Sequence, residues 1–122
     1  MDRLVIILLL TVAPPVFADD WGESDTWREV AFQSLLTVDW LQSRTVAGNP
    51  EKYSNYVETN KILGERPTVG QVNSYFLASS LLHYCISYYL PKDFREAFQY
   101  VSIGYEAGYV VNNFRAGIRI SF

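Results

Sequence analysis

The chain has 122 residues, and ten Lys and Arg against thirteen Asp and Glu give a net charge of −3. This length accommodates a single domain, and the charge excludes the broad basic surface that nucleic-acid binding requires. A lone cysteine, Cys85, excludes a disulfide within the chain and a cysteine-rich metal site. Nine Tyr and three Trp make the composition rich in side chains that favour interfaces. No cofactor is expected.

The first eighteen residues predict a signal peptide. Residues 4–12 are mostly apolar, and Val16 and Ala18 suit the −3 and −1 positions of a signal-peptidase site. The apolar run is shorter than the roughly 20 residues of a full membrane span. We therefore expect export and cleavage after Ala18, with the mature chain in the bacterial inner membrane or periplasm. An uncleaved anchor is the alternative, because Asp2 weakens the positive start.

Residues 19–122 predict a small all-α domain. Thr26 with Glu29, and Thr68 with Gln71, have the spacing of capping boxes that begin helices. Pro91 ends the second helix and leaves only a short turn, so the last two helices should form an antiparallel hairpin. The predicted elements are helices at about 27–44, 69–90 and 94–113, a loop at 45–67 and a tail at 114–122.

The C-terminal residues also allow a different interpretation. In the tail, Ile118, Ile120 and Phe122 alternate with other residues, as in a β-strand. The sequence from about residue 100 to 122 could thus form two outer-membrane strands that turn at Asn112-Asn113. The chain offers only this one clear strand pair, so helices and an inner location are preferred.

Residues 73–91 contain no Asp, Glu, Lys or Arg, yet they carry a polar stripe. Asn73, Ser80 and Ser87 recur every seven residues, with His83 between the last two. Small and hydroxylated residues often lie at helix contacts within lipid. The predicted helix at about 69–90 is about 33 Å long at 1.5 Å per residue, which is enough to cross a bilayer core. We expect a transmembrane hairpin with this stripe as its packing seam, and the wet face of a soluble helix is the alternative.

Two further patterns favour a membrane. Gly104 and Gly108 form a GxxxG motif, which permits close helix packing. If the three helices cross in turn, most Lys and Arg fall on the inner side, following the positive-inside tendency. Membrane lipid is therefore the first expected partner, and a second copy or another envelope protein is the next.

Asp39, His83 and Glu106 form a candidate polar cluster, one residue from each predicted helix. In a medium of low dielectric such a cluster could relay protons, because burial raises the pKa of a carboxyl group. A structural lock between the helices is the favoured alternative. No metal-ligand spacing and no catalytic motif occurs in the sequence, so we expect neither a metal site nor an enzyme.

Three segments, TVDWLQSR, YVETNKILGERPTVGQVNSYF and LPKDFREAFQYVSIGYEAG, carry a family resemblance. They resemble small uncharacterised bacterial and phage membrane-associated proteins with an Asp-Trp helix, an E-x-N-P-I-L-G motif and an apolar helix. Glu58, Asn60 and Gly64 stand on the motif, whereas Lys61 replaces its proline. The resemblance implies an architecture and no established activity. From the residues themselves we expect this loop motif to be structural, with Asn60 available to cap the first helix.

These patterns predict a structural or interaction role in the bacterial envelope. A phage-derived accessory of lysis or exclusion is one version, by analogy with small phage membrane proteins. A soluble periplasmic binding module and a proton- or ion-linked membrane component are the alternatives.

Overall fold

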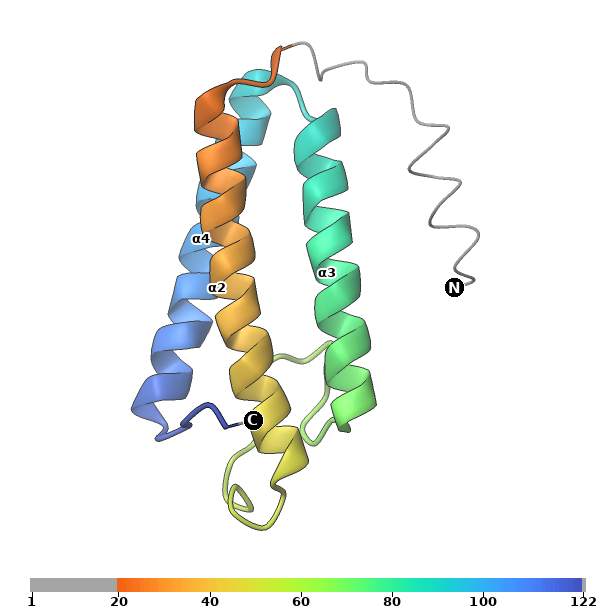
Figure 1. The fold of residues 1–122 in the computed structure, drawn as a ribbon, viewed down its shortest axis with the longest axis vertical. Coiled ribbons are helices and arrows are strands. Elements are labelled where there is room, and N and C mark those ends of the chain that lie inside the picture. Colours follow the sequence, from red (N-terminus) through yellow and green to blue (C-terminus); the bar gives the residue numbers. More distant parts are fainter. Residues whose placement is uncertain (1–19, 122) are drawn as a thin grey trace.

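The computed structural model describes residues 20–121 and contains three helices (Figure 1). They are α2 at Glu23–Gly48, α3 at Val69–Tyr89 and α4 at Lys92–Arg115. No strand occurs between residues 20 and 121, so the all-α prediction is confirmed there and the strand-pair interpretation is wrong. The predicted signal peptide, residues 1–18, lies outside the described residues.

The first predicted helix boundary is wrong. α2 begins at Glu23, because the Gly22 amide donates to Asp25 Oδ2 over 2.8 Å and fixes the first turn there. Glu29 therefore lies well inside the helix, where its side chain is buried. The second predicted start is confirmed. Thr68 Oγ1 accepts from the Gln71 amide at 3.1 Å, and Gln71 Oε1 accepts from the Thr68 amide at 2.9 Å.

Both outer helices pack on α2. α3 and α4 run antiparallel, as predicted, but they contact each other much less than each contacts α2 (Figure 1). α2 runs antiparallel to α3 and roughly parallel to α4. α2 is thus the central helix of the bundle.

Across residues 20–121, no helix is both long and apolar enough to cross a membrane, in contrast to the transmembrane hairpin predicted above. The physical reason is composition. α4 carries Lys92, Asp93, Arg95 and Glu96 in its first turns and Glu106 near its middle. α3 has no such charges, but Ser, Asn, Gln and Tyr take the place of many aliphatic residues.

The interior of the bundle is unusually polar. A small apolar core is formed by Phe32 and Leu36 of α2 and by Val72 and Phe76 of α3. The rest of the buried set on the helices consists mainly of polar and charged side chains, namely Asp25, Glu29, Asp39, Gln42, Ser43, Thr45, His83, Ser87, Arg95, Gln99 and Asn113. Large apolar side chains remain outside, including Leu77, Leu82, Ile86, Phe94, Val101, Tyr105, Val111 and Phe114.

The chain after α4 folds back onto the end of α2. Ile118 is almost fully buried, and the Ser121 amide donates to Thr45 Oγ1 over 3.1 Å. The Arg119 amide donates to the hydroxyl of Tyr53, which lies in the loop between α2 and α3. α4 ends at Arg115, about two residues beyond its predicted end. The tail that follows ties the long loop to the bundle.

Candidate functional site

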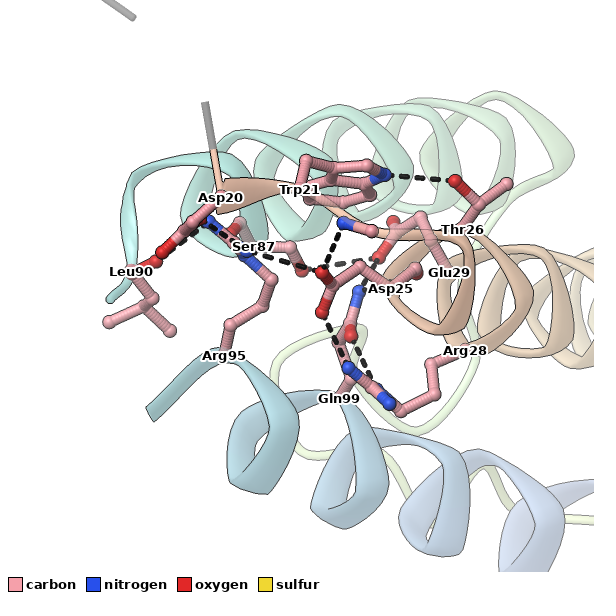
Figure 2. Close-up of polar contacts among 11 residues, drawn as sticks. Asp20, Trp21, Asp25, Thr26, Arg28, Glu29, Ser87, Leu90, Arg95 and Gln99 are labelled. Atoms are coloured by element: carbon pink, nitrogen blue, oxygen red, sulfur yellow. Dashed lines mark hydrogen bonds and ion pairs between the residues drawn. The ribbon is translucent and has the colours of Figure 1, made fainter. Parts of the chain in front are cut away.

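Arg95 organises the polar interior at the end of the bundle where α2 and α4 begin (Figure 2). Its side chain is completely buried. Nε donates to the Ser87 carbonyl at 2.7 Å, and Nη2 donates to the Leu90 carbonyl at 3.0 Å. Nη1 pairs with Asp20 at 2.9 Å and with Asp25 at 3.3 Å. One guanidinium thus binds the start of α2 to the turn between α3 and α4.

Glu29 lies one turn below Asp25 and receives hydrogen bonds from both other helices. Its Oε1 faces His83 Nδ1 at 2.9 Å, and its Oε2 accepts from Ser87 Oγ at 3.1 Å and from Gln99 Nε2 at 3.2 Å. Burial by itself raises the pKa of Glu29, but these hydrogen bonds and the His83 ring lower it below its usual value. Glu29 is therefore a buried carboxylate. We call Asp25, Glu29, His83, Ser87, Arg95 and Gln99 the Arg95 cluster.

His83 is held on both faces and at one edge. Its ring stacks on Phe32 of α2 at 3.5 Å between centroids and on Phe98 of α4 at 4.6 Å. A carboxylate can only accept, so the nitrogen facing Glu29, Nδ1, carries a hydrogen. The other nitrogen, Nε2, is buried and has no hydrogen-bond partner between residues 20 and 121.

A second polar cluster lies further along α2. Asp39 hydrogen-bonds Glu106 of α4. Asn113 Nδ2 donates to Asp39 Oδ1 at 3.1 Å and to Gln42 Oε1 at 2.9 Å. Tyr56 donates its hydroxyl to Asn113 Oδ1 at 3.0 Å. We call Asp39, Gln42, Tyr56, Glu106 and Asn113 the Asp39 cluster.

The Asp39 cluster favours protonated groups. Burial raises the pKa of Asp39, although hydrogen bonds from neighbours oppose this rise. Burial and the neighbouring Asp39 raise the pKa of Glu106 to about 8. Two carboxyl groups can hydrogen-bond only when one holds a proton, so the pair shares a proton at neutral pH. Burial, and then the charges of Glu58 and Asp39, raise the pKa of Tyr56 to about 12.

The predicted cluster of Asp39, His83 and Glu106 is only partly formed. Asp39 and Glu106 meet as expected, but His83 pairs with Glu29. Glu29 lies ten residues before Asp39 in α2, which corresponds to about 15 Å along the helix axis. The three side chains therefore belong to two different clusters.

The polar stripe of α3 does face α2. Ser87 is buried against Glu29, and Ser80 Oγ donates to Gln33 Oε1 at 2.6 Å. Asn73 is exposed, but its Oδ1 accepts from Trp40 Nε1 at 2.8 Å. The stripe therefore packs against α2, whereas the prediction placed it at the seam of a transmembrane hairpin between the last two helices.

The glycine motif of α4 is not a contact within the described chain. Gly104 and Gly108 are exposed, and a Cβ added to either would meet no atom within 4 Å among the described residues. The reason is the rotation of α4 about its axis, which turns Gln99 and Asn113 toward α2 and the two glycines away from it.

The predicted loop motif folds on itself. Glu58 Oε1 accepts from the Asn60 amide at 3.1 Å, and the Gly64 amide donates to the Asn60 carbonyl at 3.1 Å. Gly64 has a φ of 90°, a value that favours glycine. Asn60 Nδ2 donates to the Tyr75 hydroxyl at 2.7 Å, so Asn60 fastens the loop to α3 instead of capping α2.

Sequence reasoning missed the residues that centre the larger cluster, Asp25, Glu29 and Arg95. A signal was present. Arg95 lies four residues before Gln99 on α4, and Asp25 lies four residues before Glu29 on α2, so each pair shares one helix face. Assigning Glu29 to a helix cap removed it from the candidate interior.

Between residues 20 and 121, no group of three or more His, Cys, Asp or Glu is placed to hold a metal ion. Comparison of the chain with protein-family models, curated proteins and solved structures gives no match.

Proposed function

We propose that this chain is a small exported helical protein of the bacterial envelope with a structural or interaction role, and that its apolar exterior rests on the membrane. The observation that carries the proposal is the inverted polarity of the bundle. Charged and amide side chains fill the inside, while α3 and α4 expose large apolar side chains. We call Leu77, Leu82, Ile86, Phe94, Val101, Tyr105, Val111 and Phe114 the outer apolar side chains.

The physical argument rests on what a helix exposes to water. A helix in an aqueous bundle usually directs its apolar stripe inward and its charges outward. Large exposed apolar areas mark protein or membrane contacts. Leu77 of α3 is 65% exposed and Phe94 of α4 is 69% exposed, so the small apolar core covers neither side chain. A lipid surface, or an apolar surface of an envelope protein, would remove these side chains from water.

Sedimentation of membranes at neutral pH, from bacteria that express the tagged full-length chain, tests the proposal. Mass spectrometry of the purified protein first establishes whether the leader has been removed. We expect the processed chain in the membrane pellet. Release of the processed wild-type chain into the supernatant would overturn the membrane role and favour the periplasmic binding module.

Paired substitutions separate the outer apolar side chains from any other anchor. Leu77→Glu with Phe94→Glu places charge on exposed apolar positions and should release the chain. Ser24→Glu with Thr59→Glu adds the same charge at exposed positions outside α3 and α4 and should leave it in the pellet. Retention of both variants would show that these apolar side chains do not hold the chain.

Analogy with small phage membrane proteins suggests one narrower version, a phage-derived accessory of lysis or exclusion. That version predicts that overexpression collapses the membrane potential or lyses the host. A potential-sensitive dye provides the measurement, and an unchanged potential at high expression would rule the version out.

A proton-linked membrane component is a second candidate, and the shared proton of Asp39 and Glu106 favours it. Glu106→Gln keeps the shape and hydrogen-bonding capacity of the side chain but cannot titrate. In a proton-linked component this variant abolishes a pH-dependent change in membrane potential at normal abundance. Loss of abundance instead would assign the pair to the structural lock.

A further inference from the structure

A cavity of about 320 Å³ lies between α3 and α4, where these helices make few contacts. Its wall is mostly apolar and includes Leu82, Ile86 and Phe98. Two ionisable side chains also line it, His83 and Glu106, one from each polar cluster. An apolar space with a few placed polar groups is the usual form of a small-ligand site.

Each of these two side chains has one buried atom without a partner. His83 Nε2 and Glu106 Oε2 are the buried side-chain nitrogen and oxygen atoms that find no hydrogen bond between residues 20 and 121. Every other buried side-chain polar atom of that range is satisfied. Unpaired buried polar atoms are rare and costly, so two on the wall of one cavity indicate a missing partner.

The chemistry of the two atoms restricts what the partner can be. His83 Nδ1 carries the hydrogen that faces Glu29, so Nε2 of the neutral ring accepts and Nε2 of the charged ring donates. Glu106 shares its proton with Asp39, so its unpartnered oxygen, Oε2, accepts. A hydroxyl group both accepts and donates, so it can accept from Nε2 of the charged ring while it donates to Glu106 Oε2. Beside the neutral ring it donates to one of the two atoms. A carboxylate or phosphate would instead place a second negative charge beside Asp39.

We infer that the α3–α4 cavity binds an amphiphile with an apolar body and a hydroxyl head, and that His83 Nε2 and Glu106 Oε2 receive the head. The apolar body lies along Leu82, Ile86 and Phe98. Both polar atoms are covered by neighbouring side chains, so binding requires the rim to shift. Val101 and Tyr105 line the cavity and are 62% and 69% exposed, so they are the lining side chains we expect to shift.

The single histidine of the chain makes the inference testable. Proton–nitrogen correlation NMR of the full chain resolves one imidazole, so a change at Nε2 is assigned without ambiguity. Titration with octanol should displace the Nε2 resonance in a saturable manner. Its methyl ether lacks the donor and should bind about tenfold more weakly, as expected for a lost buried hydrogen bond. Equal binding of the ether would overturn the hydroxyl assignment.

Two tryptophan substitutions on α4 provide a matched pair. Val101→Trp fills the rim of the cavity and should abolish the octanol response. Val111→Trp adds the same ring at an exposed position that does not line this cavity, and it should leave the response intact. A full response in a folded Val101→Trp chain would place octanol elsewhere and overturn the site.

A lipid or a soluble alcohol could supply this hydroxyl head. Phosphatidylcholine vesicles that contain monoolein present the same hydroxyl chemistry from a lipid. A Nε2 response to these vesicles assigns a lipid source, and a response to octanol alone assigns a soluble one. No response to either overturns the inference. Leu77 and Phe94, whose substitution tests membrane pelleting, do not line this cavity, whereas Leu82, Ile86, Val101 and Tyr105 belong both to its lining and to the outer apolar side chains.

Discussion

The Arg95 cluster and the Asp39 cluster are buried in the same bundle, yet they balance charge in opposite ways. In the Arg95 cluster, a guanidinium pairs with Asp25, and Glu29 is kept as a carboxylate by donors from three helices. In the Asp39 cluster, two carboxyl groups face each other and share a proton. The difference shows that a polar interior can be held together by ion pairing or by protonation.

The contributions of the two clusters to the free energy of unfolding change with pH in opposite directions. The pKa of Glu29 is lowered by folding, so its contribution to the free energy of unfolding is present above about pH 4.5 and is lost as the pH falls. The pKa of Glu106 is raised to about 8, so its contribution is present below about pH 4.5 and is lost as the pH rises toward 8. Acid should weaken the first cluster, and mild alkali should weaken the second.

The largest expected effect is the loss of the buried cation. Arg95→Met removes the buried cation that pairs with Asp25 and leaves the Ser87 and Leu90 carbonyls without this donor, and should cost about 3–5 kcal/mol. Urea unfolding followed by circular dichroism measures it. Arg115→Met, at an exposed position of the same helix, should change the free energy of unfolding by only about 0.5 kcal/mol. Equal losses for the two would disprove the central role of Arg95.

Removal of the carboxylate at the centre of the same cluster should rank second. Glu29→Gln replaces one accepting oxygen by an amide donor that opposes His83, Ser87 or Gln99, and should cost about 2–3 kcal/mol. The acid dependence attributed to Glu29 should disappear in this variant. A stability curve that still falls below pH 5 to the same extent would assign the acid response elsewhere.

The Asp39 cluster gives a smaller effect of opposite sign. Glu106→Gln cannot lose a proton, so relative to the wild type it should gain about 1 kcal/mol between pH 5 and pH 8, a value reduced for partial exposure. Thermal unfolding at the two pH values measures the gain. A wild-type stability that does not fall over this interval would contradict the shared proton.

The smallest expected effect lies outside both clusters and calibrates the others. Thr68→Ala removes the side-chain acceptor for the Gln71 amide at the start of α3 and should cost about 1 kcal/mol. Because no charge is involved, the cost should be the same at pH 5 and pH 8. A pH-dependent cost would show that the α3 cap is coupled to the clusters.

The fold could be predicted to a large extent from local signals. The Thr68–Gln71 box and Pro91 give the start and end of α3, because capping depends on neighbouring residues only. The meeting of Asp39 and Glu106 also follows from their similar depth in the bundle. The rotation of each helix about its axis and the partner of His83 were not predicted. Glu29 lies inside α2 because this helix begins four residues before its predicted start at about residue 27. His83 lies opposite Glu29, and no local pattern reports this register between helices.

The composition of α3 was also a misleading guide to its surroundings. A charge-free helix with recurring serines fits a membrane seam, and it fits equally the inside of a bundle where Ser87 and Ser80 bond to Glu29 and Gln33. The two settings place the same residues against a neighbouring helix. They differ in what surrounds the outer apolar side chains, which a stripe of polar residues does not reveal.

The pairing of α2 with α4 has a consequence for how the chain folds. The bonds from Arg95 to Asp25, from Gln99 to the Asp25 carbonyl and from Asn113 to Asp39 each join residues 70 or 74 positions apart. Such distant contacts slow folding, because a long loop must close before any of them forms. α2 is synthesised before the other two helices, but its contacts with α4 form last. Until α4 has emerged, the carboxylates of α2 must stay in water, so assembly should be a single late step and not a growth from one end.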